Sequence, residues 1–328
     1  MTDITIKYLG GMFGSALGDA IGELAFHYRN KDDLSMQLSR LKKLRYTDDT
    51  AMSIGLAESL IKKGCLDQHD LGETFRYNYE REPWRGYASG PPTIFSIVKQ
   101  SGSTYAEAAR SLFGGTGSLG NGAAMRIVPV GLFFHDSPDL YEKACMSASV
   151  THAHPVGKDG AAVQARAVSC AVKLDPTEAF SYKSFMDTLI DTAITPQIEE
   201  KMLRVQKLIN VQSPPSFAAE QLGQTVAVHE SMPFALFSFL RHPTSFEDCL
   251  FCATLHGGDR DTLGAMACAI SGACLGIEFI PQSWREKLEN RSYIEDLALR
   301  LSEISRHSAV NNHQKPDSRM PMEIKPIF

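Results

Sequence analysis

Residues 256–262 read His-Gly-Gly-Asp-Arg-Asp-Thr, and a helix of small apolar residues is predicted to follow them. Far upstream, residues 45–50 read Arg-Tyr-Thr-Asp-Asp-Thr and open another apolar helix at 50–62. Each run places two aspartates and at least one threonine at the entrance of a helix. If the two runs meet in space, they form a pocket of oxygen ligands.

Aspartate and threonine at a helix entrance have two interpretations. They are common N-cap and first-turn residues, because their oxygens accept the free amide hydrogens there. One such residue is enough to cap a helix, whereas each run holds a doubled set. Four aspartates packed together would raise one another's pKa values unless a cation lies among them. Oxygen ligands suit Mg²⁺, Ca²⁺ or Mn²⁺, so the pattern favours a metal site over capping alone.

The composition is that of a globular protein, with 43% hydrophobic and 22% charged residues in a chain of 328. A formal net charge of -5 argues against a surface for nucleic acid or anionic membrane. Seven cysteines without framework spacing indicate reduced thiols and a cytoplasmic location. The apolar stretch 8–17 is followed by Asp19 and Glu23, so we interpret it as a core helix and expect no transmembrane segment.

The rest of the chain is predicted to be helical, with almost no strand alternation and no internal repeat. The expected helices are 5–25, 50–62, 70–80, 93–100, 105–112, 123–134, 141–150, 160–174, 184–195, 197–209, 218–240, 246–255 and 291–304. Residues 31–46 are expected to form a short helix or a loop. We predict one all-α domain over residues 1–304 with a central metal-binding cleft, and a flexible tail at 305–328.

Two local patterns shape this picture further. The first helix carries many glycines and alanines, which predicts that another backbone approaches it closely near a functionally important region. Residues 210–215 are the best candidate for a linker. They do not convincingly divide the chain, because the two aspartate runs lie on either side of them.

Residues 114–122 read Gly-Gly-Thr-Gly-Ser-Leu-Gly-Asn-Gly and contain the dinucleotide fingerprint Gly-x-Gly-x-x-Gly. The fingerprint requires a preceding strand, whereas residues 105–112 are plainly helical, so this interpretation is rejected. The Gly-Lys-Ser/Thr ending of a P-loop is also absent. Successive amides on glycines can still wrap a phosphate or pyrophosphate, and an ordinary mobile loop is the alternative.

Histidine and cysteine motifs are weaker signals. His152 and His154 lie around a turn, where a polar contact to a ligand or simple capping is expected. Cys249, Cys252 and His256 have zinc-like spacing but lie among large apolar residues, so we predict a buried core position for them.

Four segments in the same order resemble the ADP-ribosylglycohydrolase family. They are Gly-Asp-Ala-Ile-Gly at 18–22, Tyr-Thr-Asp-Asp-Thr at 46–50, Gly-Ser-Leu-Gly-Asn-Gly at 117–122 and Gly-Gly-Asp-Arg-Asp-Thr at 257–262. The likeness runs from about residue 5 to residue 304. The most similar branch is that of the ADP-ribosylserine hydrolases and their bacterial relatives, which residues 85–87, 230–233 and 279–284 also resemble.

The resemblance implies a site for two Mg²⁺ ions, with Mn²⁺ as a possible substitute. Its implied ligands are Thr47, Asp48 and Asp49 on one side and Asp259, Asp261 and Thr262 on the other, with Asp261 bridging. The implied reaction is hydrolysis of an ADP-ribosyl glycosidic bond on a modified protein side chain, through an oxocarbenium-like transition state. Asp48 and Asp259 are the carboxylates that we expect to act as general base.

The resemblance also assigns the substrate-binding residues. The pyrophosphate is expected on the glycine loop formed by Gly115, Gly117, Ser118, Leu119, Gly120, Asn121 and Gly122. Phe113 is expected to stack near the adenine, and His152 to reach the adenosine side. The partners are therefore ADP-ribose or an ADP-ribosylated protein, and the chain is expected to act as a monomer.

Three positions depart from the family pattern. The family glutamate eight residues after the Gly18 glycine is replaced by Phe26, and Glu23 is the nearby carboxylate that could take its catalytic role. Leu119 stands where an aromatic residue is common, which should weaken adenine stacking. Arg260 replaces a small residue between two aspartates, and we expect it to point away and pair with an acidic surface group.

The sequence leaves the acceptor open. The glycine motifs favour a serine or other O-linked acceptor, residues 152–155 also resemble the arginine-specific and dinitrogenase-reductase branches, and free O-acetyl-ADP-ribose is a third candidate. Two other functions are open as well. One is a catalytically weak ADP-ribose binder or a crystallin-like structural protein, which the missing glutamate favours. The other is a magnesium-dependent phosphohydrolase acting on a nucleotide.

Overall fold

Helices account for the regular structure of the chain. The structure is a computed structural model that describes the backbone of residues 3–313 and the side chains of residues 3–306. Between residues 3 and 313, helices alternate with turns and loops, and no β-strand forms. The prediction of an all-α fold is therefore confirmed.

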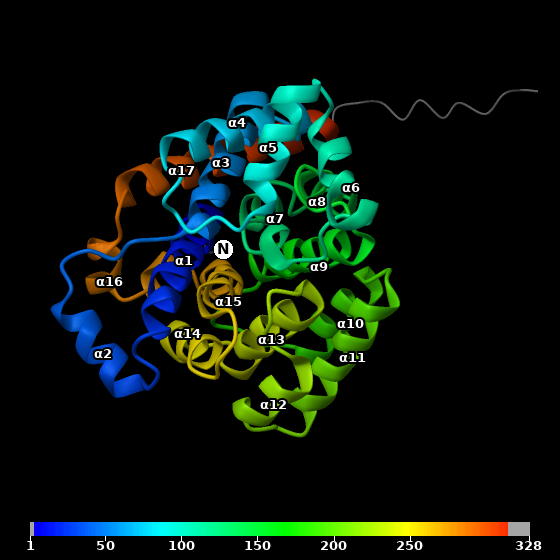
Figure 1. Ribbon diagram of the computed structural model, residues 1–328. Helices are drawn as coiled ribbons and strands as arrows, with labels where there is room; N and C mark the ends of the chain where they lie inside the picture. The colour runs from blue at the N-terminus through cyan, green and yellow to red at the C-terminus, as the bar shows by residue number, and fades with distance from the viewer. Residues whose placement is uncertain (1–2, 314–328) are drawn as a thin grey trace, which may run out of the picture.

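Two helices rich in small residues, α1 (Ile4–Ala25) and α15 (Arg260–Leu275), pack backbone to backbone at the centre of the molecule (Figure 1). The contact follows glycines spaced four apart on one face of α1. A Cβ atom added at Gly18 would lie 2.1 Å from the carbonyl oxygen of Gly264, and one at Gly10 would lie 2.1 Å from that of Gly272. The predicted glycine face thus permits an approach that a larger residue would block.

The other helices surround this pair (Figure 1). In chain order they are α2 (Lys31–Arg40), α3 (Asp48–Lys63), α4 (Gln68–Arg81), α5 (Gly90–Ser101), α6 (Tyr105–Gly115), η1 (Asn121–Ala123), α7 (Val128–Phe133), α8 (Leu140–Ser149), α9 (Pro155–Ala171), α10 (Tyr182–Thr192), α11 (Pro196–Asn210), α12 (Pro215–Leu222), α13 (Val228–Arg241), α14 (Phe246–Thr254), η2 (Ile277–Phe279), α16 (Gln282–Lys287) and α17 (Arg291–His313).

Several predicted helices are interrupted. The helix expected over 218–240 is two helices, because Gly223 adopts φ +87° after the end of α12 and α13 begins only at Val228. The helix expected over 123–134 is reduced to a short 3₁₀ turn and α7. Within 31–46, the helical part is α2. In the first two cases, continuous apolar character concealed a break in the backbone, whereas the short helix expected within 31–46 does form.

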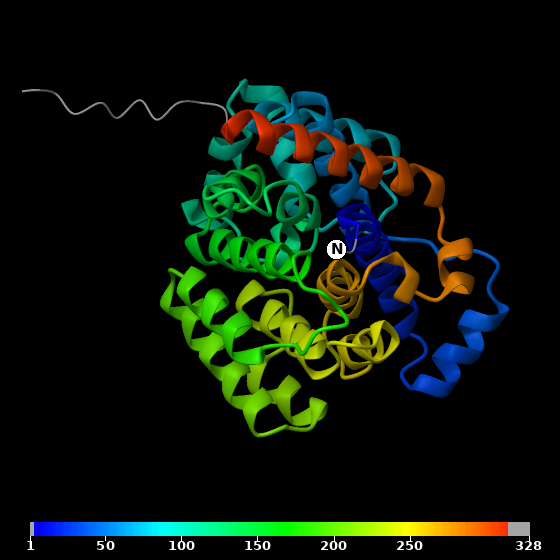
Figure 2. The same ribbon diagram turned by 180° about the vertical axis from the view of Figure 1, so that it is seen from behind.

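Helix α17 lies across the outer side of α1, α3 and α7 (Figure 2). It continues to His313 and so passes residue 304, where the sequence suggested that the domain would end. Residues 314–328 lie outside the described residues, so the flexible tail stays a prediction for that segment.

The segment 210–215 is a short turn between α11 and α12. One hydrophobic core includes residues on both sides of it, such as Leu208 and Ala218. This turn is therefore not a domain boundary. Within the described residues, no helix combines the length and the apolar character needed to cross a membrane.

Candidate active site

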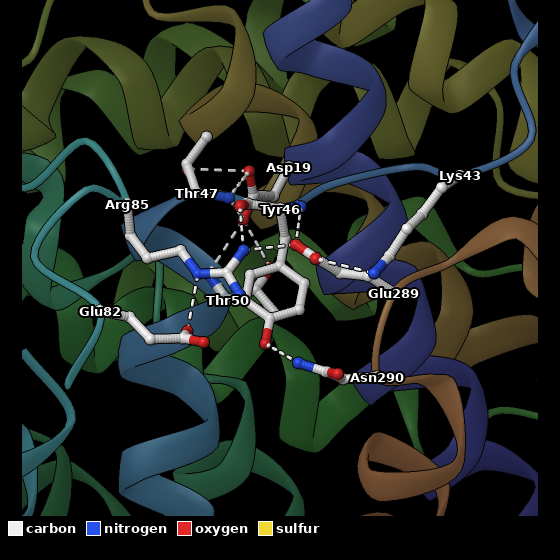
Figure 3. Close-up of polar contacts among 9 residues, drawn as sticks. All are labelled: Asp19, Lys43, Tyr46, Thr47, Thr50, Glu82, Arg85, Glu289 and Asn290. Carbon is white, nitrogen blue, oxygen red and sulfur yellow. Dashed lines mark hydrogen bonds and ion pairs between the residues drawn. The ribbon is translucent and has the colours of Figure 1, made fainter.

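Asp19 of α1 organises the start of α3. Its buried carboxylate accepts hydrogen bonds from the backbone amides of Thr47 and Thr50, each at 3.0 Å. It also accepts hydrogen bonds from their hydroxyl groups, at 2.8 Å and 2.5 Å respectively (Figure 3). A residue of another helix therefore supplies the capping that the first turn of α3 needs.

This arrangement bears on the choice between capping and metal binding. Thr47 and Asp259 are the N-cap residues of α3 and α15, and no described amide donates a capping hydrogen bond to the side chain of either. Asp261 does accept a hydrogen bond from the amide of its neighbour Thr262, at 2.9 Å. Capping thus explains Asp19 well and the paired aspartates only in part.

The two aspartate runs line a common cavity of about 300 Å³. From these runs, the wall includes Asp48, Asp49, Asp259, Asp261 and Thr262. From the other predicted segments, it includes Phe113, Ser118, Gly120, Asn121, Gly122 and His152. The remaining predicted residues, Glu23, Thr47, Gly115, Gly117 and Leu119, lie outside the cavity wall. Gly86 and residues 88–91, for which the sequence motifs predict no role in the site, form a further side of the cavity.

The carboxylates of the cavity raise one another's pKa values. Burial, followed by the charge of Asp19, raises the pKa of Asp48 to about 7. Burial and the charge of Asp259 raise the pKa of Asp261 to about 8. For Asp49, burial and the charges of its acidic neighbours raise the pKa well above its usual range. The site is therefore short of positive charge.

The donor set fits a hard divalent cation in its chemistry. One oxygen of Asp49, Oδ1, is buried and has no hydrogen-bond partner among the described residues. Such an atom is costly to bury unless a proton or a cation satisfies it. In the described part of the chain, no three acidic, histidine or cysteine side chains converge as they would around a bound ion. The residues thus suit a hard divalent cation by their chemical type, and their side chains do not converge on a common point.

The crowded carboxylates predict how the metal-free protein responds to pH. Because the folded-state pKa values of Asp48, Asp49 and Asp261 are raised, the folded chain binds protons more tightly than the unfolded chain. Stability should therefore fall as the pH rises from about 4, the ordinary aspartate pKa, towards 8. We expect the melting temperature in EDTA to drop by several degrees between pH 5.5 and pH 8. The Asp49→Asn variant should show a smaller drop, and an equal drop in both proteins would contradict the prediction.

The glycine loop wraps one side of the cavity. The last turn of α6 is broken, and left-handed φ values of +53° at Phe113 and +68° at Gly114 turn the chain into the loop. Phe113 is 64% exposed where it borders the cavity. Asn121 links this loop to the aspartates, because its Nδ2 donates to Asp259 Oδ2 at 2.7 Å. The loop and the α15 aspartates therefore form one connected surface.

This combination of sequence and geometry agrees with comparison to known proteins. The family model described as ADP-ribosylglycohydrolase matches residues 1–310. The chain belongs to the ADP-ribosylglycohydrolase family. The prediction of a hydrolase of this family is thereby confirmed.

Individual relatives match nearly the whole chain of this glycohydrolase. The ADP-ribosylhydrolase ARH3 of Homo sapiens is 30% identical over 92% of this chain and 94% of its own. ARH3 of Danio rerio is 32% identical over 91% and 90% of the two chains. The ADP-ribosyl-[dinitrogen reductase] glycohydrolase of Rhodospirillum rubrum is 27% identical over 86% of this chain and 90% of its own.

A solved structure supports the fold of the glycohydrolase. It is described as an ADP-ribosylglycohydrolase-related protein complex, and it superposes with a TM-score of 0.70 at 23% identity. The match covers 93% of this chain and 100% of the other.

The two histidines of the glycohydrolase have different roles. His152 lines the cavity, and burial, reinforced by the charge of Arg126, lowers its pKa to about 3. It is therefore neutral at physiological pH, with Nδ1 lying 2.7 Å from the hydroxyl oxygen of Thr151. His154 instead caps α9, because its ring nitrogen accepts a hydrogen bond from the amide of Val156 at 3.1 Å.

Arg126 also contributes to the site, and no sequence motif predicted this role. Its buried guanidinium donates to the carbonyl oxygens of Gly122, at 2.9 Å, and Ser147, at 3.2 Å. It also lies 4.8 Å from the centre of the Phe75 ring. Arg126 thus stabilises the glycine loop through the Gly122 carbonyl and places a positive charge near Asp48. The sequence feature that could have indicated this role is a single arginine within the apolar stretch 123–134.

The departures from the family pattern also have locations. Glu23 is exposed outside the cavity wall, although its charge contributes to the raised pKa of Asp261. Phe26 caps the end of α1 and is 36% exposed. Arg260 does point away from the cavity, but the expected acidic partner was wrong. Its guanidinium donates to the carbonyl oxygen of Thr254, at the end of α14, where a positive charge complements the helix dipole.

Cys249 and Cys252 are buried in the core, as predicted. His256 is only half-buried, so the predicted core position was wrong for this residue. It packs edge-on against the ring of Phe234, with 6.3 Å between the ring centres, and does not join the cavity wall. This packing supports a structural role for these three residues.

Proposed function

We propose that this chain hydrolyses the glycosidic bond between ADP-ribose and a modified protein side chain, and that the reaction depends on Mg²⁺. The observation that carries the proposal is one cavity that joins four aspartates to a glycine-rich loop. The aspartates suit a metal-assisted hydrolysis, and the loop suits a pyrophosphate. Membership of the family and the names of the relatives support the same chemistry.

The residues that would hold Mg²⁺ are Thr47, Asp48, Asp49, Asp259, Asp261 and Thr262. Bound there, the ions would hold the ribose hydroxyls and polarise a water molecule beside the anomeric carbon. Asp48 or Asp259 would take the proton of that water as general base. The hydrogen bond from Asn121 orients the Asp259 carboxylate. This orientation would favour attack of the water molecule on the anomeric carbon from one direction.

The other end of the cavity would bind the adenosine diphosphate portion. The backbone amide of Gly122 would donate to the pyrophosphate, whereas that of Gly120 already donates to Ser118 Oγ at 3.1 Å. Phe113 would stack on the adenine. Neutral His152 would offer a ring nitrogen to the adenosine side without adding charge. Because Leu119 lies outside the cavity wall, its replacement of an aromatic residue should matter less than the sequence suggested.

We favour a serine or other O-linked acceptor, and an arginine acceptor is the alternative. The motifs Gly-Asn-Gly at 120–122 and Gly-Gly-Asp at 257–259 support the first, and residues 152–155 resemble the arginine-specific branch. His154 caps a helix here, so its presence has a structural explanation that does not require an arginine acceptor.

The deciding experiment measures ADP-ribose release from serine- and arginine-ADP-ribosylated peptides. Each peptide is incubated with Mg²⁺, with Mn²⁺ and with EDTA, and the products are separated by chromatography. We expect release from the serine peptide with Mg²⁺, a fall of at least about 100-fold in EDTA, and recovery when Mg²⁺ is restored. Release that is unaffected by EDTA would contradict the proposed metal dependence.

The second candidate function is binding of ADP-ribose without turnover. Phe26 favours it, because an aromatic side chain at the family's glutamate position can neither ligate a metal nor transfer a proton. In the same experiment, binding of ADP-ribose with no release from either peptide would support this candidate. Formation of AMP or phosphate would instead indicate a phosphohydrolase.

A further inference from the structure

Arg85 lies buried in the loop between α4 and α5, outside the cavity wall. Its Nε donates to a carboxylate oxygen of Glu82 at 2.8 Å. Another nitrogen of the guanidinium donates to the carboxylate of Glu289 and, at 3.0 Å, to the backbone carbonyl of Tyr46. The guanidinium also stacks over the Tyr46 ring, 4.1 Å from its centre (Figure 3). Arg85 therefore joins three segments that are distant in sequence.

Tyr46 is the shared target of these contacts. Its amide donates to Glu289 Oε1 at 3.1 Å, and its hydroxyl oxygen accepts a hydrogen bond from Asn290 at 2.8 Å (Figure 3). A β-bridge between Leu44 and Leu288 sets the alignment of the two backbones. The amide, the carbonyl, the ring face and the hydroxyl of Tyr46 are thus all fixed by other segments. We call Arg85, Glu289 and Asn290 the Tyr46 clamp.

The clamp adjoins the proposed metal ligands directly. Tyr46 precedes Thr47, whose amide and hydroxyl are held from the inner side by Asp19. The entrance to α3 is therefore fixed between Asp19 within the core and the clamp on the outer side. In addition, a Cβ atom at Gly86 would lie 3.7 Å from Asp48 Oδ1. A shift of Arg85 would move the neighbouring Gly86 relative to that carboxylate.

The charges of this group are balanced within it. Glu289 pairs with Arg85 and, at 3.6 Å, with Lys43, while Glu82 pairs with Arg85. A buried ion pair is weak evidence for a gain in stability, because desolvation offsets most of the attraction. The contacts instead specify geometry, since the planar guanidinium meets a carboxylate, a carbonyl and a ring at fixed angles.

We propose that Arg85 and Glu289 are positioning residues that set the location of Thr47 and Asp48 for the reaction. They act through the backbone of Tyr46 and through Gly86, and they touch neither the substrate nor the metal. The inference extends the proposed function, because it explains how the α3 side of the site is held ready. It also makes a claim about the metal-free backbone that does not require turnover.

The test uses Arg85→Lys, which keeps the charge but loses the planar fork and the stacking surface. Hydrogen–deuterium exchange is measured in EDTA on peptides covering residues 44–52. We expect exchange at the Thr47 and Thr50 amides to be at least about tenfold faster than in the unchanged protein. Peptides from α10 and α11 should be unaffected. With Mg²⁺ present, we expect kcat and Mg²⁺ affinity to fall about 10- to 100-fold, with a smaller change in KM.

Arg76→Lys is the matched control. Arg76 lies on α4 and also pairs with two carboxylates, those of Glu73 and Glu80, but it does not contact Tyr46. This variant should leave exchange over 44–52 and kcat unchanged. If Arg85→Lys fails to fold, Glu289→Gln takes its place with the same expected directions.

Exchange over 44–52 within twofold of the unchanged protein, or equal acceleration in the Arg76 control, would overturn the proposal. The exchange result decides it even if the unchanged protein releases no ADP-ribose. Failure of the proposed function and failure of the clamp are thus separate outcomes.

Discussion

The Asp261→Asn variant is expected to release ADP-ribose about a thousandfold more slowly than the unchanged protein. Asp261 lies in the cavity wall at the start of α15, where its charge acts on the Asp49 carboxylate of α3. Asp261 is one of the residues that would hold the proposed Mg²⁺ ions, so its loss should weaken their binding. A metal ion contributes several kcal/mol to such a transition state, which corresponds to about three powers of ten in rate. The measurement is single-turnover release at saturating Mg²⁺.

Thermal unfolding in EDTA distinguishes this effect from misfolding. At pH 8, Asp261→Asn should melt at a higher temperature than the unchanged protein, because it removes one of the mutually repelling carboxylates. Asp296→Asn is a suitable control, since Asp296 is an exposed residue of α17 that pairs with Arg300. A loss of activity that comes with a lower melting temperature, or that the control shares, would contradict the assigned role.

The Gly18→Ala variant is expected to be strongly destabilised. A methyl group at this position would lie 2.1 Å from the carbonyl oxygen of Gly264 and 2.9 Å from the amide nitrogen of Ala265. Both obstacles are backbone atoms of α15, so a side-chain rotation cannot relieve the clash. The two helices would have to separate, and we expect a loss of at least about 3 kcal/mol in the free energy of unfolding. Denaturant unfolding followed by circular dichroism measures it.

Gly90→Ala provides the comparison. A Cβ atom at Gly90 meets no described atom within 4 Å, and its helical backbone needs no left-handed conformation. We expect its free energy of unfolding to stay within about 0.5 kcal/mol of the original value. If Gly18→Ala is equally mild, the close crossing of α1 and α15 does not exist in solution.

The features predicted well from the sequence are those that depend on residue type and spacing within one segment. The many small residues of 5–25 indicated a close helix contact, and doubled aspartates at two helix entrances indicated a shared cavity. Spacing does not show which partner lies opposite. Asp19 belongs to the motif at 18–22. Its hydrogen bonds to the threonines of α3 depend on how α1 and α3 lie relative to each other.

Contacts between segments that lie far apart in the chain could not be predicted from the sequence pattern. Arg85 meets a carbonyl and a carboxylate from segments on both sides of it in the chain, and neither local period nor composition encodes such a pairing. The wall formed by Gly86 and residues 88–91 was not predicted for a similar reason. These residues are rich in proline and glycine, as many loops are, and only their location beside Asp48 gives them a role in the site.

The crossing of α1 and α15 also has a consequence for biosynthesis. The glycine face of α1 leaves the ribosome long before its partner, since translation at roughly 5–20 residues per second separates the two helices by tens of seconds. During that interval the nascent chain has no α15 to cover this face or to complete the cavity. Catalytic competence would therefore arise late and all at once, and a chain that stops before residue 260 would present the α1 surface to chaperones.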